Sequence, residues 1–148
     1  MRKILFVCLG NICRSPAAEA VTRAKAASLF PDLTLDSAGT GAWHVGEPPY
    51  GPMQAVGAAR GYDLSPLRAR QFHAGDFDAF DLIVVMDEEN QRDAEGLRPA
   101  SNVTPIRLFT DFADTHETAV PDPYFTRDFD GALELIEQCA DGLIATLD

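Results

Sequence analysis

The sequence contains few cysteines, and it has no long apolar run. Three cysteines are too few, and odd in number, for the disulfide framework of a small secreted domain. The apolar run at residues 4–9 ends at Gly10, well short of the roughly 20 apolar residues of a membrane span. It is also shorter than the apolar core of a usual signal peptide. We therefore expect a cytoplasmic protein without a membrane-spanning segment.

Basic residues are also scarce. The chain has 12 Lys and Arg against 23 Asp and Glu, which gives a formal net charge of −11. Phosphate backbones and anionic membrane surfaces attract basic proteins, so this charge argues against nucleic-acid and membrane partners. Taken alone it would also disfavour an anionic substrate, but the local field of a site can oppose the net charge. The length of 148 residues suits one domain over residues 1–148.

Apolar segments alternate with segments of helical periodicity. Strands are expected at residues 4–7, 33–35, 80–86 and 103–108, and helices at residues 51–60, at residues 130–147, and after Ser15 and Asp87. Ser15 would be the N-cap of its helix, and Pro105 suggests that the last strand lies at a sheet edge. The alternation predicts an α/β fold with a parallel sheet and helices on both faces. Ligands of such folds bind beyond the C-terminal ends of the strands, so the loop after the first strand is the first candidate site.

This loop contains a pattern suited to binding an anion. Cys8 ends the strand, Arg14 follows after five residues, and a helix begins at once. Backbone N–H groups of a tight loop can converge on one point, and the helix N-terminus adds its positive end. Gly10 and Asn11 tolerate the left-handed conformations of such a ring. Arg14 can bind an oxyanion bidentately, and the same field favours the nucleophilic thiolate of Cys8.

The Ser15 hydroxyl could donate a hydrogen bond to the Cys8 sulfur and stabilise it as a leaving group. A simpler interpretation also remains open at this point. Cys8 could be a buried residue at a strand end, with Arg14 paired to a surface carboxylate.

Residues Val7–Pro16, VCLGNICRSP, resemble the phosphate-binding loop of the low-molecular-weight protein tyrosine phosphatases. The resemblance continues in four further segments, which are Asp36–Thr40, Ala69–Gln71, Met86–Asp87 and Asp122–Tyr124. It covers nearly the whole chain in matching order. It implies a three-layer α/β/α fold with a four-stranded parallel sheet in the order 2-1-3-4, and an enzyme that hydrolyses phosphotyrosine in proteins.

The resemblance also implies roles for individual residues. Cys8 would attack phosphorus and form a cysteinyl-phosphate, while Arg14 would stabilise the transition state. Asp122 would protonate the leaving tyrosine and then activate water, which releases inorganic phosphate; alternatively, it is only a turn former before Pro123. The remaining residues expected around the phosphate are Leu9, Gly10, Asn11, Ile12, Cys13 and Ser15.

Apolar walls are expected to select the substrate. Ile12, Trp43 and Tyr124 fall where the crevice of the family forms, although Trp43 could instead belong to the core. Related phosphoarginine phosphatases typically have Thr at the position of Ile12, so Ile12 favours phosphotyrosine. Tyr124 is followed by Phe125, where the family often has a second Tyr.

Three positions carry further expectations. Cys13 could form a regulatory disulfide with Cys8, or it could be a small buried side chain. Cys139 is expected in the core. Many members have a His at the position of Leu67, in a hydrogen-bond network behind the loop, and here Asn11, Ser15 and Ser37 would remain.

Several alternatives stay open. An arsenate reductase of the same fold would need two further cysteines to relay a disulfide, and only Cys13 and Cys139 remain. A phosphotyrosine-binding or redox module would use the loop without turnover. The three His show no ligand spacing, so no metal and no cofactor is expected. The expected partner is a phosphotyrosine protein, such as a tyrosine kinase, and the enzyme is expected to be a monomer.

Overall fold

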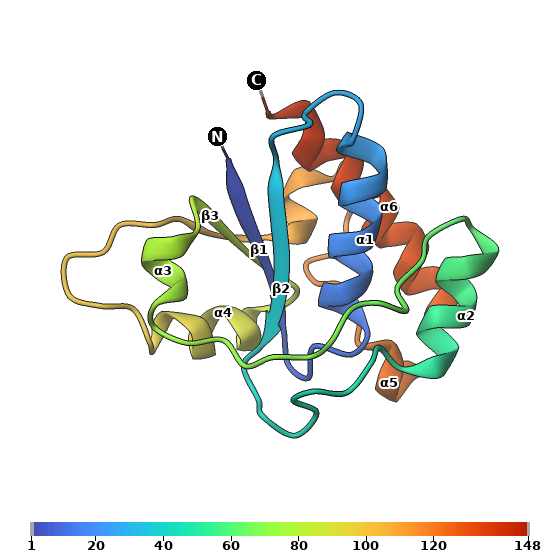
Figure 1. Cartoon of the computed structure of the whole chain (residues 1–148), viewed down its shortest axis with the longest axis horizontal. Helices are drawn as coiled ribbons and strands as arrows, with labels where there is room; N and C mark the ends of the chain where they lie inside the picture. Colours follow the sequence, from blue (N-terminus) through green and yellow to red (C-terminus); the bar gives the residue numbers. More distant parts are fainter. Residues whose placement is uncertain (1, 148) are drawn as a thin grey trace.

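A parallel sheet forms the centre of the computed structural model, which describes residues 2–147 (Figure 1). Within these residues the sheet has four strands in the order β2-β1-β3-β4. The strands are β1 (Lys3–Cys8), β2 (Thr34–Gly39), β3 (Leu82–Val85) and β4 (Ile106–Leu108). All three neighbouring pairs are parallel. The predicted strand order and the predicted edge position of the last strand are confirmed.

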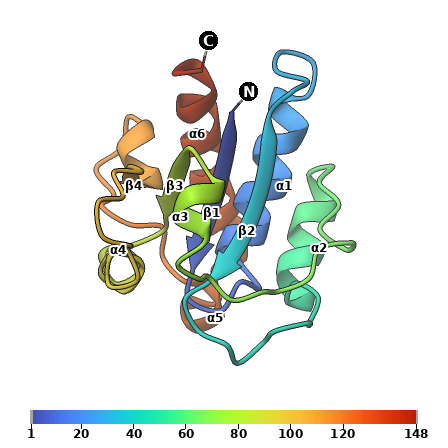
Figure 2. The ribbon, with the colours of Figure 1, turned by 60° about the vertical axis from the view of Figure 1, so that its left-hand side comes forward.

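Helices cover both faces of the sheet, so the predicted three-layer fold is confirmed as well (Figure 2). Helices α1 (Arg14–Ala26), α2 (Gly51–Ala59) and α6 (Phe129–Ala145) lie on one side. The short helix α3 (Asp76–Ala79) and α4 (Glu88–Glu95) lie on the other. The 3₁₀ turn η1 (Phe109–Phe112) and the short helix α5 (Pro123–Thr126) complete the elements.

The central strand explains why two cores form. Side chains of a strand alternate between its two faces. Phe6 therefore packs in the cluster that contains α1 and α6, while Leu5 and Val7 pack in the cluster that contains Phe77 of α3. All of these side chains are at most 1% exposed, and each contributes roughly 1.5–3 kcal/mol of burial free energy.

Some predicted boundaries are wrong for identifiable reasons. Helix α1 begins at Arg14 with Cys13 at the N-cap and no side-chain cap, so Ser15 does not cap the helix. Strand β2 continues to Gly39 because it pairs with β1 along its whole length. Strand β4 begins only at Ile106, after Pro105. Helices α3 and α5 were not predicted, because each has only four residues, too few to show a helical period.

The topology directs attention to one end of the sheet. The chain runs from β1 outward to β2 and then returns to β3 on the other side of β1, so the strand order reverses at β1. The loops after β1 and β3 therefore emerge side by side at the C-terminal end of the sheet. Among residues 2–147, no helix is long and apolar enough to cross a membrane.

Candidate active site

The loop after β1 curls around the sulfur of Cys8. The backbone N–H of Asn11 donates to Cys8 Sγ at 3.3 Å, and Ser15 Oγ lies 3.0 Å from the same sulfur. Asn11 has a φ of 56°, in the left-handed region that the tight loop requires. Helix α1 begins at Arg14, so its positive end points at the loop. The predicted left-handed turn at Asn11 and the predicted contact of Ser15 with the sulfur are both present.

Arg14 is buried beside the loop and held by three groups. Its guanidinium donates to Asp87 Oδ2 at 2.7 Å, to the carbonyl of Val120 at 3.1 Å and to Asp122 Oδ2 at 3.4 Å. Burial by itself would lower the pKa of Arg14, but the charges of Cys8, Asp122 and Asp87 outweigh it and raise the pKa above its ordinary value. A permanent positive charge therefore lies inside a protein of net charge −11.

Asp87 is a site residue that the sequence alone did not single out. It follows β3 directly and caps α4, because its Oδ1 accepts from the backbone N–H of Asn90 at 2.7 Å. Its second oxygen faces Arg14. The signal was present in Met86–Asp87, which belongs to the resemblance, but only the register of β1 beside β3 brings the two side chains together.

A hydrogen-bond network supports the loop from behind. The side-chain amide of Asn11 donates to Ser15 Oγ at 2.8 Å and to Ser37 Oγ at 3.0 Å. Its oxygen accepts from the backbone N–H of Arg70 at 2.9 Å. The predicted network of Asn11, Ser15 and Ser37 is therefore formed. Leu67 is half-buried against the core, and its apolar side chain cannot take part in this network.

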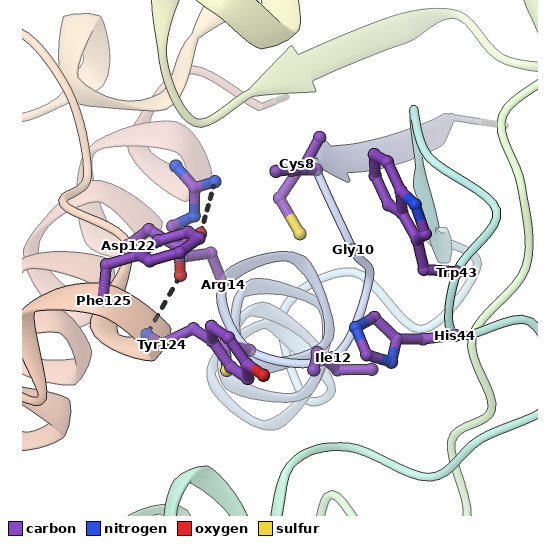
Figure 3. A pocket seen from close by; sticks show the side chains of 11 residues that line it. Cys8, Gly10, Ile12, Arg14, Trp43, His44, Asp122, Tyr124 and Phe125 are labelled. Carbon is purple, nitrogen blue, oxygen red and sulfur yellow. Dashed lines mark hydrogen bonds and ion pairs between the residues drawn. The ribbon is translucent and has the colours of Figure 1, made fainter.

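These loop residues open onto a pocket of about 250 Å³ (Figure 3). Its lining residues are Cys8, Leu9, Gly10, Ile12, Cys13, Arg14, Trp43, His44, Asp122, Tyr124 and Phe125. Of the predicted site residues, Asn11 and Ser15 do not line it and lie behind the loop.

The rim of the pocket is aromatic on both sides. Trp43 and His44 lie on one side, and Tyr124 and Phe125 lie on the other, with Cys8 Sγ pointing between them (Figure 3). Trp43 is 73% exposed, so it belongs to the rim and not to the core. His44 is paired with Glu47 and packs beside Gly10. Neither His44 nor Phe125 was predicted to line the site, because isolated His and Phe residues carry no spacing signal.

Asp122 reaches the pocket from the far end of the chain. It caps the short helix α5, since its Oδ1 accepts from the backbone N–H of Tyr124 at 3.1 Å. Its other oxygen faces Arg14, although these two residues are 108 positions apart in the sequence. The carboxyl group is thus fixed by its own turn and oriented toward the loop.

The other two cysteines differ from Cys8 in their surroundings. Burial, followed by the charges of Cys8 and Asp122, raises the pKa of Cys13 to about 12. Burial alone raises the pKa of Cys139 to about 12, and its side chain is fully enclosed, in line with the predicted core position. All three cysteines are free thiols. Over residues 2–147, no cluster of His, Cys, Asp and Glu is arranged to hold a metal ion.

Comparison with known proteins identifies the family. The model of the family described as low molecular weight phosphotyrosine protein phosphatase matches residues 3–148. The protein YfkJ of Bacillus subtilis, named a low molecular weight protein-tyrosine-phosphatase, is 39% identical over 150 residues, which covers 99% of this chain and 96% of that protein. PtpA of Staphylococcus saprophyticus, of the same description, is 37% identical and covers 97% of this chain and 92% of its own.

Solved structures agree with this result. The crystal structure of YfkJ superposes with a TM-score of 0.94 at 40% identity, over 99% of this chain and 94% of that one. A protein tyrosine phosphatase of Entamoeba histolytica superposes with a TM-score of 0.91 at 37% identity, over 98% and 96% of the two chains. Sequence, fold and the Cys8 loop therefore lead to one conclusion: the chain belongs to the low molecular weight phosphotyrosine protein phosphatase family and is a hydrolase of the protein-tyrosine-phosphatase class.

Proposed function

We propose that this protein hydrolyses phosphotyrosine in proteins through a cysteinyl-phosphate intermediate. One observation carries the proposal. Cys8 Sγ, the Arg14 guanidinium and the Asp122 carboxyl group converge on one pocket at the C-terminal end of β1. A nucleophile, a fixed cation and a carboxyl group are the three groups that phosphoryl transfer without a metal requires.

Substrate binding uses the loop and Arg14. The phosphate dianion enters the ring of loop N–H groups at the positive end of α1. Arg14 contributes its charge at a defined angle, because Asp87 holds one of its nitrogens. The equatorial oxygens of the transferring phosphoryl group then receive hydrogen bonds that strengthen as the transition state forms.

Chemistry proceeds in two displacements. The Cys8 thiolate attacks phosphorus, the bond from phosphorus to the tyrosine oxygen breaks, and protonated Asp122 gives its proton to that oxygen. A water molecule then attacks phosphorus and gives one proton to Asp122, while the sulfur–phosphorus bond breaks and inorganic phosphate is released. Ser15 Oγ lies 3.0 Å from the sulfur, and a hydrogen bond donated by its hydroxyl group stabilises the departing thiolate.

The rim supports an aryl substrate. Trp43 and Tyr124 form walls on opposite sides of the pocket, and Ile12 adds an apolar surface to its lining. A phenyl ring can stack on such walls, whereas the shorter phosphoserine leaves them uncovered. The interpretation as an arsenate reductase finds less support, because Cys139 is fully enclosed on the buried face of α6 and cannot relay a disulfide without unfolding.

The setting of the enzyme is part of the same proposal. We infer a cytoplasmic monomer of one domain that acts on a phosphotyrosine protein, such as a tyrosine kinase, without nucleic-acid or membrane partners. The free thiols and the net charge of −11 support this setting.

The test compares variants on aryl phosphates. Cys8→Ser should abolish turnover, and appreciable residual hydrolysis would refute the mechanism. Asp122→Ala should slow the hydrolysis of aryl phosphates with poor leaving groups far more than that of aryl phosphates with good ones, because only poor leaving groups need a proton as they depart. Equal losses would show that Asp122 is not the acid. Phosphotyrosine, phosphoarginine and phosphoserine should be compared in parallel, with vanadate as inhibitor.

A further inference from the structure

A charged side chain is buried behind the phosphate loop. Glu19 lies on α1 and is only 4% exposed. Carboxylates are rarely buried without a partner, and each oxygen of Glu19 has one. One oxygen accepts from the Ser37 hydroxyl of β2 at 2.8 Å. The other accepts from the Arg23 guanidinium, one turn further along α1, at 2.6 Å. Arg23 also donates to the carbonyl of Leu35, which ties the ion pair to β2. The reaction steps above make no use of this pair.

The pair is connected to the nucleophile by hydrogen bonds. Ser37 Oγ lies 3.0 Å from the amide nitrogen of Asn11, and this nitrogen lies 2.8 Å from Ser15 Oγ. Ser15 Oγ in turn lies 3.0 Å from Cys8 Sγ. A continuous path of four hydrogen bonds therefore runs from the Glu19 carboxylate to the Cys8 sulfur.

The two ends of this path determine its direction. A carboxylate can only accept, so the single hydroxyl proton of Ser37 is used on Glu19, and Ser37 must accept from Asn11. The side-chain amide of Asn11 cannot flip to exchange its oxygen and nitrogen, because the oxygen already accepts from the backbone N–H of Arg70.

The remaining steps follow from this orientation. Ser15 accepts from the second N–H of Asn11, so its own proton is left for the Cys8 sulfur. The competing acceptor, the carbonyl of Ala38, is more distant at 3.4 Å. Bonds in such a chain also polarise one another, so a charge at one end strengthens the donor at the other.

We propose that Glu19, held by Arg23, is a positioning residue for the phosphatase reaction. It anchors Ser37 and Asn11 so that Ser15 donates to Cys8 Sγ. This inference rests on the proposed cysteinyl-phosphate mechanism. The effect is on the charge of the sulfur, as attacking thiolate and as leaving thiolate, and not on binding of the aromatic ring. Loss of Glu19 should therefore lower kcat and leave KM almost unchanged.

The experiment uses Glu19→Gln, Ser37→Ala and the double variant. Glu19→Gln keeps the shape and removes the charge, while Ser37→Ala cuts the path without touching the ion pair. Each should lower kcat about tenfold, the effect expected for one buried hydrogen bond to a charged group, with KM within about twofold. The double variant should lose no more than Ser37→Ala alone, because both changes act through one path.

A matched control exists on α6. Glu137 is also held by an arginine, Arg60, and by a hydroxyl, that of Tyr62 at 2.7 Å, but among residues 2–147 no hydrogen-bonded path leads from it to Cys8. Glu137→Gln should keep the wild-type kcat.

A second readout does not depend on turnover. The rate of Cys8 alkylation by iodoacetamide should be measured against pH. Loss of the label in Cys8→Ser would show that the label is on Cys8. The pH midpoint should move upward in Glu19→Gln and in Ser37→Ala, because the thiolate loses hydrogen-bond support.

The outcomes are separable. An unchanged kcat and alkylation midpoint in Ser37→Ala would overturn the proposal, even if Glu19→Gln failed to fold. Additive losses in the double variant would also overturn it, since Glu19 would then act by another route. Failure of the proposed function would instead appear as absent turnover in the wild type, and the alkylation profiles would still test the hydrogen-bond path.

Discussion

Asp87 offers a direct test of how this protein orients Arg14, the cation of the proposed mechanism. Its Oδ2 lies 2.7 Å from an Arg14 nitrogen, and its Oδ1 caps α4 through Asn90. Asp87→Asn preserves the cap, because Asn is as good an N-cap as Asp. It removes the negative charge that faces the guanidinium. The substitution therefore separates the contact with Arg14 from the stability of α4.

The magnitude follows from the geometry. A hydrogen bond to a charged buried group contributes about 1.5–3 kcal/mol, and each 1.4 kcal/mol corresponds to about a factor of ten in rate. Arg14 keeps weaker contacts to Val120 and Asp122, so part of its orientation survives. We expect kcat/KM for an aryl phosphate to fall by roughly ten- to a hundredfold. The thermal unfolding temperature should fall by several degrees, because Arg14 stays buried with one partner fewer.

The assay is steady-state hydrolysis, with thermal unfolding measured on the same samples. Asp93→Asn is the matched control, because it makes the same change of charge on an exposed position of the same helix. A kcat/KM within twofold of the wild type in Asp87→Asn would refute the reasoning. An equal loss in Asp93→Asn would refute it as well, because the effect would then come from net charge.

Two further predictions concern pH and salt. Because burial raises the pKa of Cys139 to about 12 from an ordinary value of 9.0, the unfolded chain loses this proton first as pH rises. The contribution of the Cys139 thiol to the free energy of unfolding should thus be fully present below about pH 9 and be lost between about pH 9 and 12. Cys139→Ala should flatten this decline when unfolding is measured against pH, and an unaltered slope would contradict the prediction. Acidic phosphopeptides should associate faster at moderate than at low salt, because the net charge of −11, which includes Glu88 and Glu89 in the first turn of α4, repels them. Stopped-flow association rates that do not depend on salt would count against this.

How well the sequence predicts a feature of this protein depends on how far apart the residues that form it lie along the chain. The apolar run of β1, the left-handed Asn11 and the Arg14 side chain lie within a dozen residues, so local pattern and covalent geometry suffice to predict them. Short elements were less predictable. Helix α5 has four residues and no periodicity, and it forms because Asp122 caps its own turn and Pro123 begins the helix.

The sequence alone determined the alternating α/β organisation and the tight loop between Cys8 and Arg14, because both are encoded by neighbouring residues. Only the tertiary structure decided which distant groups meet there. Parallel pairing of β1 with β3 brings Asp87 to one terminal nitrogen of Arg14, and the path back from β4 brings Asp122 to the other. The burial of Glu19 likewise depends on α1 packing against β2. Such contacts follow from the packing of the whole chain, which no local pattern specifies.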